Sequence, residues 1–138
     1  MTSIPIHPVQ KSKTSCRVLI VDDNADAAMT MAVMLELQGH TVRYITSPLQ
    51  AIAAAMEMRP HVVLLDIGMP VLNGFDVANL LRKELGAALE IIAVSGFADP
   101  ATRARAVQAG FNGHFEKPAD TLLIQASIQR ACSKQSAQ

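Results

Sequence analysis

Residues 62–76 read VVLLDIGMPVLNGFD, and this stretch decides the fold. Four apolar residues, 62–65, run without interruption into Asp66, which is typical of a strand covered on both faces of a parallel sheet. Helical periodicity begins at about Gly74 and places apolar residues on one stripe. The stretch therefore predicts one βα unit with an aspartate at the point where its strand ends.

The same alternation of short apolar runs and helical periodicity occurs five times along the chain. Repeated βα units of this kind form a parallel sheet with helices on both faces. Ligands of such open sheets bind outside the carboxyl ends of the strands. The expected strands are residues 18–21, 41–45, 62–65, 91–94 and 114–116, of which 41–45 and 114–116 lie near the edges. The expected helices are residues 25–38, a segment that Ser47 caps and Pro48 opens, 74–85, 99–110 and 120–132.

The composition fits one domain and excludes several classes of protein. Half of the 138 residues are hydrophobic and 17% are charged, so the chain can bury a core and is not disordered. Twelve basic residues balance twelve acidic ones, so no overall positive field attracts nucleic acid or anionic lipid. No apolar run reaches the ~18 residues of a membrane helix, and the start does not resemble a signal peptide. We therefore expect a cytoplasmic protein without nucleic-acid or membrane partners.

The two ends of the chain lack the βα pattern. We expect residues 1–15 to form a flexible polar leader, residues 16–132 to form the domain and residues 133–138 to form a flexible tail. Cys16 and Cys132 are the only cysteines. They are far apart in sequence and neither has zinc-ligand spacing to a histidine, which argues against both a zinc site and a disulfide scaffold. A reducing compartment is the default expectation.

Polar residues follow four of the five predicted strands. They are Asp22 and Asp23 after the first strand, Asp66 after the third, Ser95 after the fourth and Lys117 after the fifth. A single polar residue after a strand is usually a loop residue or a helix cap. Three carboxylates on adjacent strands differ, because a like-charged pair about 5 Å apart costs on the order of 3 kcal/mol at an effective dielectric constant near 20. A cation relieves this repulsion, and an oxygen-only ligand set favours Mg²⁺, with Mn²⁺ as an alternative.

These residues stand in recognisable motifs: Asp22 and Asp23 after VLIV, Asp66 in VVLLDIGMPVLNGFD, Ser95 in IIAVSGFAD and Lys117 in AGFNGHFEKP. Together the motifs resemble the receiver domain of two-component response regulators. The resemblance covers nearly all of residues 16–132, and Pro70 and Gly74 match the family's usual turn. It implies a flavodoxin-like α/β fold, a doubly wound parallel sheet of five strands in the order 2-1-3-4-5.

The resemblance also implies a phosphorelay function. Asp66 would accept a phosphoryl group from a phosphohistidine of a sensor kinase or a histidine phosphotransfer protein. Asp22, Asp23, Asp66 and the backbone carbonyl of Gly68 would bind Mg²⁺. The chain would then act on an unknown downstream protein through altered protein–protein interaction.

The chemistry of the residues agrees with these roles. In-line attack of a carboxylate on phosphorus needs positive charge near the three equatorial oxygens, which Mg²⁺ and Lys117 supply, with the Ser95 hydroxyl as a further donor. The product is an acyl phosphate that hydrolyses readily, so it suits a temporary signal. We expect no enzymatic activity beyond self-phosphorylation from small donors and self-dephosphorylation.

A conformational switch is a further implication of the resemblance. Ser95 would move toward the phosphoryl group, and the side chain three residues before Lys117 would turn inward and alter the face of the fourth helix, fifth strand and fifth helix. That position is His114, where the family more often has Tyr or Phe; the histidine resembles receivers attached to hybrid kinases. A plain surface role for His114 is equally open. The other histidines, which we expect to lie away from the site without partners, are His7, His40 and His61.

Alternative functions follow from the same residues. A phosphatase of the haloacid dehalogenase type also forms an aspartyl phosphate, but it needs an acid two residues after its nucleophile, where this chain has Gly68. A nucleotide- or flavin-binding protein needs glycines in the first loop, which here reads DDNADAA (residues 22–28). A receiver-like adaptor that is never phosphorylated is the third alternative. Met1 and the short leader favour a complete single-domain regulator over a part of a hybrid kinase.

Overall fold

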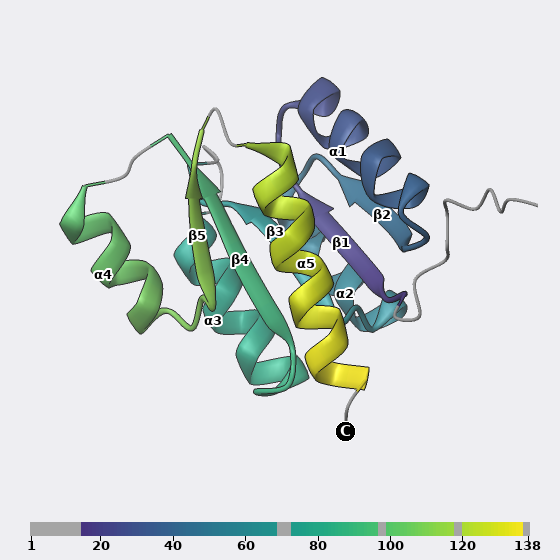
Figure 1. Cartoon of the computed structure of the whole chain (residues 1–138). Helices are drawn as coiled ribbons and strands as arrows, with labels where there is room; N and C mark the ends of the chain where they lie inside the picture. The colour runs from purple at the N-terminus through teal and green to yellow at the C-terminus, as the bar shows by residue number, and fades with distance from the viewer. Residues whose placement is uncertain (1–14, 69–72, 97–98, 118–119, 137–138) are drawn as a thin grey trace, which may run out of the picture.

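A computed structural model, which describes residues 15–68, 73–96, 99–117 and 120–136, shows a parallel sheet flanked by helices (Figure 1). The strands are β1 (Arg17–Val21), β2 (Thr41–Ile45), β3 (Val62–Asp66), β4 (Glu90–Ser95) and β5 (Gly113–Glu116). The helices are α1 (Ala25–Leu37), α2 (Ala51–Met58) with the preceding 3-10 turn η1 (Pro48–Gln50), α3 (Gly74–Leu85), α4 (Pro100–Gln108) and α5 (Thr121–Ser136). All neighbouring strands pair in parallel in the order β2-β1-β3-β4-β5. The predicted flavodoxin-like fold and strand order are confirmed.

Both faces of the sheet are buried, which explains the unbroken apolar runs of the central strands. Leu19, Leu65 and Ile91 pack with α2, α3 and α4 on one face. Ile20 and Leu64, one position along their strands, pack with α1 and α5 on the other face. Figure 1 shows the same layers, with α1 and α5 in front of the sheet and α2 and α3 behind it. The core therefore holds the carboxyl ends of β1, β3 and β4 in fixed positions.

Side-chain caps start three of the helices at the carboxyl edge of the sheet. The side-chain oxygens of Asn24, Asn73 and Asp99 accept backbone N–H groups in the first turns of α1, α3 and α4. Each such cap stabilises the domain by about 1 kcal/mol. Ser47 occupies the predicted cap position and Pro48 the first helical position, but the Ser47 side chain makes no cap hydrogen bond and Pro48 opens the 3-10 turn η1 before α2.

The last helix is longer than predicted. α5 continues to Ser136, so residues 133–136, which we expected in the flexible tail, belong to the helix. Their sequence SKQS holds no glycine or proline to end a helix, and Lys134 in the last turn interacts favourably with the helix dipole. Residues 1–14 and 137–138, together with Pro70 of the predicted turn, lie outside the described residues. The remaining domain limits stay a prediction.

The two cysteines are joined by a disulfide, so the expectation that their spacing argues against one was wrong. Cys16 precedes β1 and Cys132 lies in α5, and their Cα atoms are 5.8 Å apart although 116 residues separate them in sequence. The fold brings the start of β1 and the end of α5 to the same amino edge of the sheet. Linear spacing between the cysteines could not show this proximity.

Two histidines have partners at the same edge, contrary to the prediction. Nδ1 of His40 accepts the backbone N–H of Cys16 at 3.2 Å, and Nδ1 of His61 accepts that of Arg17 at 3.0 Å. Both imidazoles precede strands that flank β1, so they meet amide groups at its beginning. His7 lies outside the described residues.

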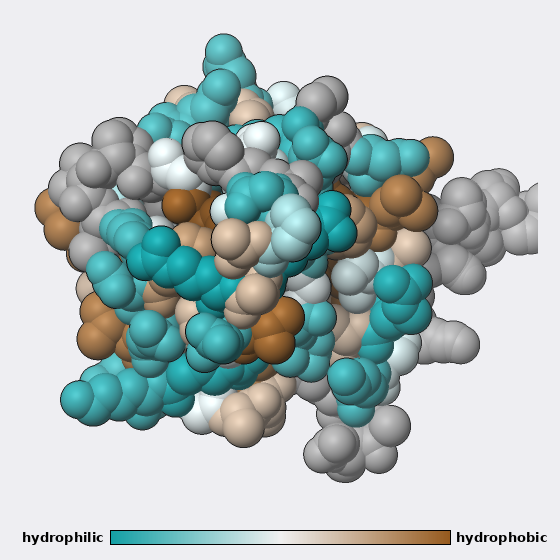
Figure 2. All heavy atoms as spheres, turned by 90° about the vertical axis from the view of Figure 1, so that its left-hand side faces the viewer, coloured by the Kyte–Doolittle hydropathy of each residue, from teal (hydrophilic) through white to brown (hydrophobic). Residues whose placement is uncertain are grey.

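The surface on the α4 side is mostly hydrophilic, and its hydrophobic groups are separated by polar ones (Figure 2). Val107 of α4 is one of the exposed apolar residues, as are Leu122 and Leu123 of α5. Among the described helices, none combines the length and the apolar character needed to cross a membrane.

Candidate functional site

The predicted acidic residues meet at the carboxyl edge of the sheet. Asp66 is the last residue of β3, and Asp22 and Asp23 directly follow the neighbouring strand β1. Each of the three offers a carboxylate oxygen, and these oxygens all lie within 4.8 Å of one another. Asp22 and Asp66 are buried, whereas Asp23 is exposed. The site is therefore a half-open acidic cluster in which two carboxylates are buried and one faces solvent.

Lys117 reaches the cluster from the end of β5. Its Nζ donates to Oδ2 of Asp66 at 3.0 Å and to Oδ2 of Asp22 at 3.4 Å. The backbone N–H of Lys117 donates to the carbonyl of Ser95 at 2.7 Å, which ties the end of β5 to the end of β4. The ammonium group thus lies between two of the three carboxylates, as the sequence predicted for a fixed positive charge at this edge.

Backbone amides hold the other oxygens of the buried carboxylates. Oδ1 of Asp22 accepts the N–H of Asn24 at 2.9 Å, and Oδ1 of Asp66 accepts the N–H of Gly68 at 2.8 Å. Each carboxylate therefore has one oxygen fixed by the loop that follows its strand and one oxygen directed to Lys117. Asn24 is not among the site residues predicted from the sequence; its position two residues after a buried aspartate was the available signal.

The electrostatics leave the cluster short of positive charge. Burial raises the pKa of Asp22, and the nearby charge of Asp66 adds to this, while the hydrogen bond from Asn24 and the charge of Lys117 act in the opposite direction. Burial alone would lower the pKa of Lys117, but its hydrogen bond to Asp66 and the charges of Asp66 and Asp22 raise it overall. Lys117 is therefore a permanent cation, yet it does not fully offset the acids.

The donor set fits a hard divalent cation. Three carboxylates supply only oxygen ligands, and a site with one exposed member leaves room for water and a phosphate oxygen, as Mg²⁺ and Mn²⁺ require. The described residues also contain a second group with metal-ligand atoms, Cys16, His40 and Cys132, at the opposite edge of the sheet.

Gly74 allows the start of α3 to approach the chain next to the acidic cluster. A Cβ atom at this position would lie 2.5 Å from the Cα of Ile67, a distance at which one backbone would have to move. Ile67 directly follows Asp66. The close approach therefore explains why a glycine opens this helix, and it fixes the loop whose amide at Gly68 holds Asp66.

The two residues of the expected switch lie in neighbouring strands. Ser95 is fully buried at the end of β4, and His114 lies in β5 opposite Ala93. Both ring nitrogens of His114 are buried and make no hydrogen bond with the described residues. Burial lowers the pKa of His114, and the charge of Arg103 lowers it further. The lowered pKa favours the neutral form of this half-buried imidazole, and its switch role stays a prediction.

A cavity of about 670 Å³ adjoins the cluster between α1 and α5. Asp22, Asp66 and Lys117 line its polar end, and Met31 and Ile124 contribute to its apolar wall. No periodic pattern of the sequence indicates this cavity, because it depends on how far apart two helices pack. It gives the cluster an open approach from the α1 and α5 side.

The fold and the site together define a flavodoxin-like α/β domain with an acidic, lysine-containing centre at the carboxyl edge of its sheet. Residues 18–129 match the family model of the response regulator receiver domain. The chain belongs to this family and is a receiver domain of two-component signal transduction.

Curated relatives agree with this assignment. The transcriptional regulatory protein PrrA of Mycobacterium bovis is 33% identical over 105 residues, which are 76% of this chain and 45% of PrrA. The DNA-binding response regulator MtrA of Mycobacterium tuberculosis is 32% identical over 102 residues, 74% of this chain and 44% of MtrA. This chain thus spans less than half the length of either relative. An uncharacterized 14.6 kDa protein of Leptolyngbya boryana is 29% identical over 116 residues, 83% of this chain and 88% of that protein.

Solved structures show the same fold. A CheY-like receiver domain protein from Methanospirillum hungatei has a TM-score of 0.83 at 22% identity and covers 90% of this chain and 98% of its own. A response regulator from Desulfuromonas acetoxidans has a TM-score of 0.73 at 27% identity and covers 83% of this chain and 94% of its own.

Proposed function

We propose that Asp66 accepts a phosphoryl group from a phosphohistidine of a sensor histidine kinase or a histidine phosphotransfer protein. One observation carries the proposal: Lys117 Nζ lies 3.0 Å from Asp66 within a cluster of three acidic side chains. The buried carboxylate supplies a nucleophilic oxygen. Lys117 supplies one positive charge for phosphoryl transfer, and the two further acids can bind a cation that supplies another.

In the proposed transfer, a carboxylate oxygen of Asp66 forms a bond to phosphorus while the phosphorus–nitrogen bond of the phosphohistidine breaks. The bonding electron pair stays on the donor's imidazole, which leaves as a neutral ring after it takes a proton. The N–H of Gly68 orients the Asp66 carboxylate, and the Lys117 ammonium stabilises the negative charge on the oxygens of the transferred phosphoryl group.

A divalent cation completes the proposed site. Asp22, Asp23, Asp66 and the backbone carbonyl of Gly68 would hold Mg²⁺, or Mn²⁺ in its place. When bound, the ion supplies positive charge against the equatorial oxygens of the phosphoryl group.

Phosphorylation of Asp66 would change the conformation of the neighbouring strands β4 and β5. The Ser95 hydroxyl would donate to a phosphoryl oxygen, and His114 would change position beside α4. The hydrogen bond between Lys117 N–H and the Ser95 carbonyl supports this coupling, because it links the ends of β4 and β5. The altered face of α4, β5 and α5 would bind an unknown downstream protein.

The domain in this proposal is a phosphoacceptor with self-phosphorylation and self-dephosphorylation, and not a turnover enzyme. It would act in the cytoplasm, where kinases use ATP to make phosphohistidine, without a nucleic-acid or membrane partner. The family match does not favour the phosphatase alternative, and Gly68 stands where that class needs an acid.

Intact-mass measurement after incubation with Mg²⁺ and acetyl phosphate tests the proposal. The wild type should gain one phosphoryl group, the Asp66→Asn variant should gain none, and Asp76→Asn, an exposed acid of α3, should behave like the wild type. If neither acetyl phosphate nor a phosphorylated phosphotransfer protein gives an adduct, the domain is an adaptor. Multiple turnover on small phosphate esters would show a phosphatase.

A further inference from the structure

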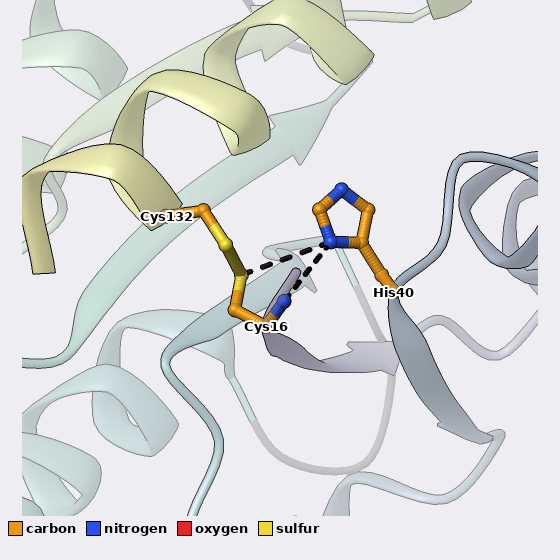
Figure 3. A group of neighbouring side chains, drawn as sticks. All are labelled: Cys16, His40 and Cys132. Carbon is orange, nitrogen blue, oxygen red and sulfur yellow. Dashed lines mark hydrogen bonds between the residues drawn. A yellow bond between two sulfur atoms is a disulfide. The ribbon is translucent and has the colours of Figure 1, made fainter. Parts of the chain in front are cut away.

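A second reactive group lies at the amino edge of the sheet, opposite the acidic cluster. Cys16 precedes β1, Cys132 lies in α5 and His40 precedes β2. All three are buried, with exposed fractions of 6%, 1% and 4%. Figure 3 shows the imidazole of His40 facing Cys16, whose sulfur is bonded to that of Cys132.

His40 presents an unprotonated nitrogen to Cys16. Its Nδ1 accepts the N–H of Cys16 at 3.2 Å, so that nitrogen carries a lone pair and the neutral ring has its proton on Nε2. The same Nδ1 lies 3.9 Å from the Cys16 sulfur (Figure 3). Burial lowers the pKa of His40, which keeps the ring neutral. A neutral imidazole beside a thiol can accept its proton and favour the reactive thiolate.

We propose that Cys16 and Cys132 are a reversible redox pair, in which His40 activates Cys16 toward a small hydroperoxide. The Cys16 thiolate attacks one peroxide oxygen, the O–O bond breaks, and Cys16 becomes a sulfenic acid as hydroxide leaves and takes a proton to form water. The Cys132 sulfur then attacks the Cys16 sulfur, and the sulfenic oxygen leaves as a second water with the thiol proton. Two thiols thus lose two electrons to one peroxide.

The geometry favours a disulfide over a metal site. The Cα separation of 5.8 Å lies within the usual range for a disulfide, about 4.4 to 6.8 Å. A structural zinc site needs about four ligands, and only Cys16, His40 and Cys132 meet here among the described residues. The burial of both sulfurs admits only a small oxidant.

The bond would change how α5 is held. It closes a sequence separation of 116 residues and fastens α5 to the start of β1, whereas the thiol form leaves this end of α5 to the packing of Ile128 and Ala131. Cross-links across long loops stabilise proteins because they restrict the unfolded chain. Oxidant level would therefore set the stability of the domain, without any part for Asp66.

The test uses the full chain, reduced and then treated with hydrogen peroxide. Alkylation under denaturing conditions should show two free thiols before treatment and none after it, within a monomer, and dithiothreitol should restore both. The oxidised protein should melt about 10 °C above the reduced protein. With Cys132→Ser, a dimedone probe should trap the sulfenic acid on Cys16.

His40→Asn separates activation from structure, because the asparagine oxygen can still accept the Cys16 N–H. This variant should react with peroxide about tenfold more slowly at neutral pH and lose the imidazole's pH dependence. His61→Asn is the matched control, since His61 also accepts a backbone N–H but lies in another contact, and its rate should equal that of the wild type. Thiols of the folded protein that stay reduced, a bond between two chains only, or stoichiometric Zn²⁺ binding that blocks alkylation would overturn the proposal.

Discussion

The carboxyl and amino edges of the sheet differ in how their buried polar residues are paired. At the carboxyl edge, Asp22 and Asp66 are buried beside each other with only Lys117 between them, and burial raises the pKa of Asp22. At the amino edge, the buried His40 is neutral and bonded to the backbone of Cys16. The carboxyl edge therefore concentrates acidic groups that repel one another, while polar groups of the amino edge are held in hydrogen bonds to the backbone.

We therefore expect the carboxyl edge to serve phosphoryl acceptance and the amino edge to serve the stability of the fold. Polar groups of the amino edge connect elements: Arg17 donates to the carbonyls of Met58 and Arg59 at the end of α2, and Arg82 of α3 donates to the carbonyl of Gly110 after α4. At the carboxyl edge, repulsion among acids costs stability unless a cation binds. Substitutions at the two edges should therefore affect different measurements.

The largest effect is expected from Lys117→Ala. Removing the ammonium group leaves the charge of the transferred oxygens without its fixed partner, so the rate of phosphoryl acceptance from acetyl phosphate should fall about 10²- to 10³-fold. Stopped-time intact-mass measurements give the rate. Lys134→Ala, which removes an exposed lysine paired with Glu90, is the control and should keep the wild-type rate. A wild-type rate for Lys117→Ala would contradict its place in the site.

Arg82→Ala should show the reverse pattern. Its guanidinium donates to the carbonyls of Gly86, Leu89 and Gly110 and to Asn112 Oδ1, so its loss removes the donor of two partly buried carbonyls, those of Leu89 and Gly110. The free energy of unfolding in urea should fall by about 2 to 4 kcal/mol, with phosphoryl acceptance retained.

The exposed ion pair of Arg43 with Glu57 is the matched control for Arg82. Arg43→Ala should cost less than about 1 kcal/mol. If both arginine variants lose the same free energy of unfolding, the hydrogen bonds of Arg82 contribute no more stability than an exposed ion pair.

Mg²⁺ should stabilise the wild type through the carboxyl edge alone. At about ten times its dissociation constant, the ion adds about 1.4 kcal/mol and raises the melting temperature by about 5 °C. Asp23→Asn should lose most of this rise, because it removes the exposed member of the cluster. Asp26→Asn removes an exposed acid of α1 with the same change in charge and should retain the rise. An undiminished rise in Asp23→Asn would argue against this residue as a ligand.

The smallest effect is the contribution of His114 to the loss of stability at acidic pH. Because burial lowers its pKa in the folded state, the unfolded chain binds a proton near pH 6.5 that the folded chain does not. This contribution makes stability fall as pH decreases through 6.5 toward the lower pKa of the folded state. Melting curves at pH 7.5 and 5.5 should therefore differ less in His114→Phe than in the wild type; an equal difference would mean that His114 titrates normally. His40 and His61, whose pKa values burial also lowers, contribute to the remaining loss in the same direction.

Periodicity and residue type were enough for the fold and the membership of the acidic cluster. Continuous apolar runs predicted the central strands, and because parallel strands end at one edge, the convergence of Asp22, Asp66 and Lys117 followed from strand ends alone. The helix over residues 74–85 followed from periodicity, whereas its Asn73 cap and the close approach at Gly74 became visible only in the structure.

Contacts between distant elements were not predictable in the same way. The pairing of Cys16 with Cys132 depends on the length and direction of α5, and the partners of His40 and His61 depend on which strands flank β1. These features arise from tertiary arrangement, which single-sequence spacing does not encode. The Asn24 amide that holds Asp22 was missed because its role is a backbone one.

Locating the phosphoryl group tests the central claim most directly. After incubation with acetyl phosphate, borohydride reduction converts an aspartyl phosphate to homoserine, which peptide mass spectrometry assigns to one position. We predict homoserine at Asp66 alone, formed in the presence of Mg²⁺ and absent when a chelator removes the ion. Homoserine at another aspartate, or an equal yield at Asp66 without a divalent cation, would contradict it.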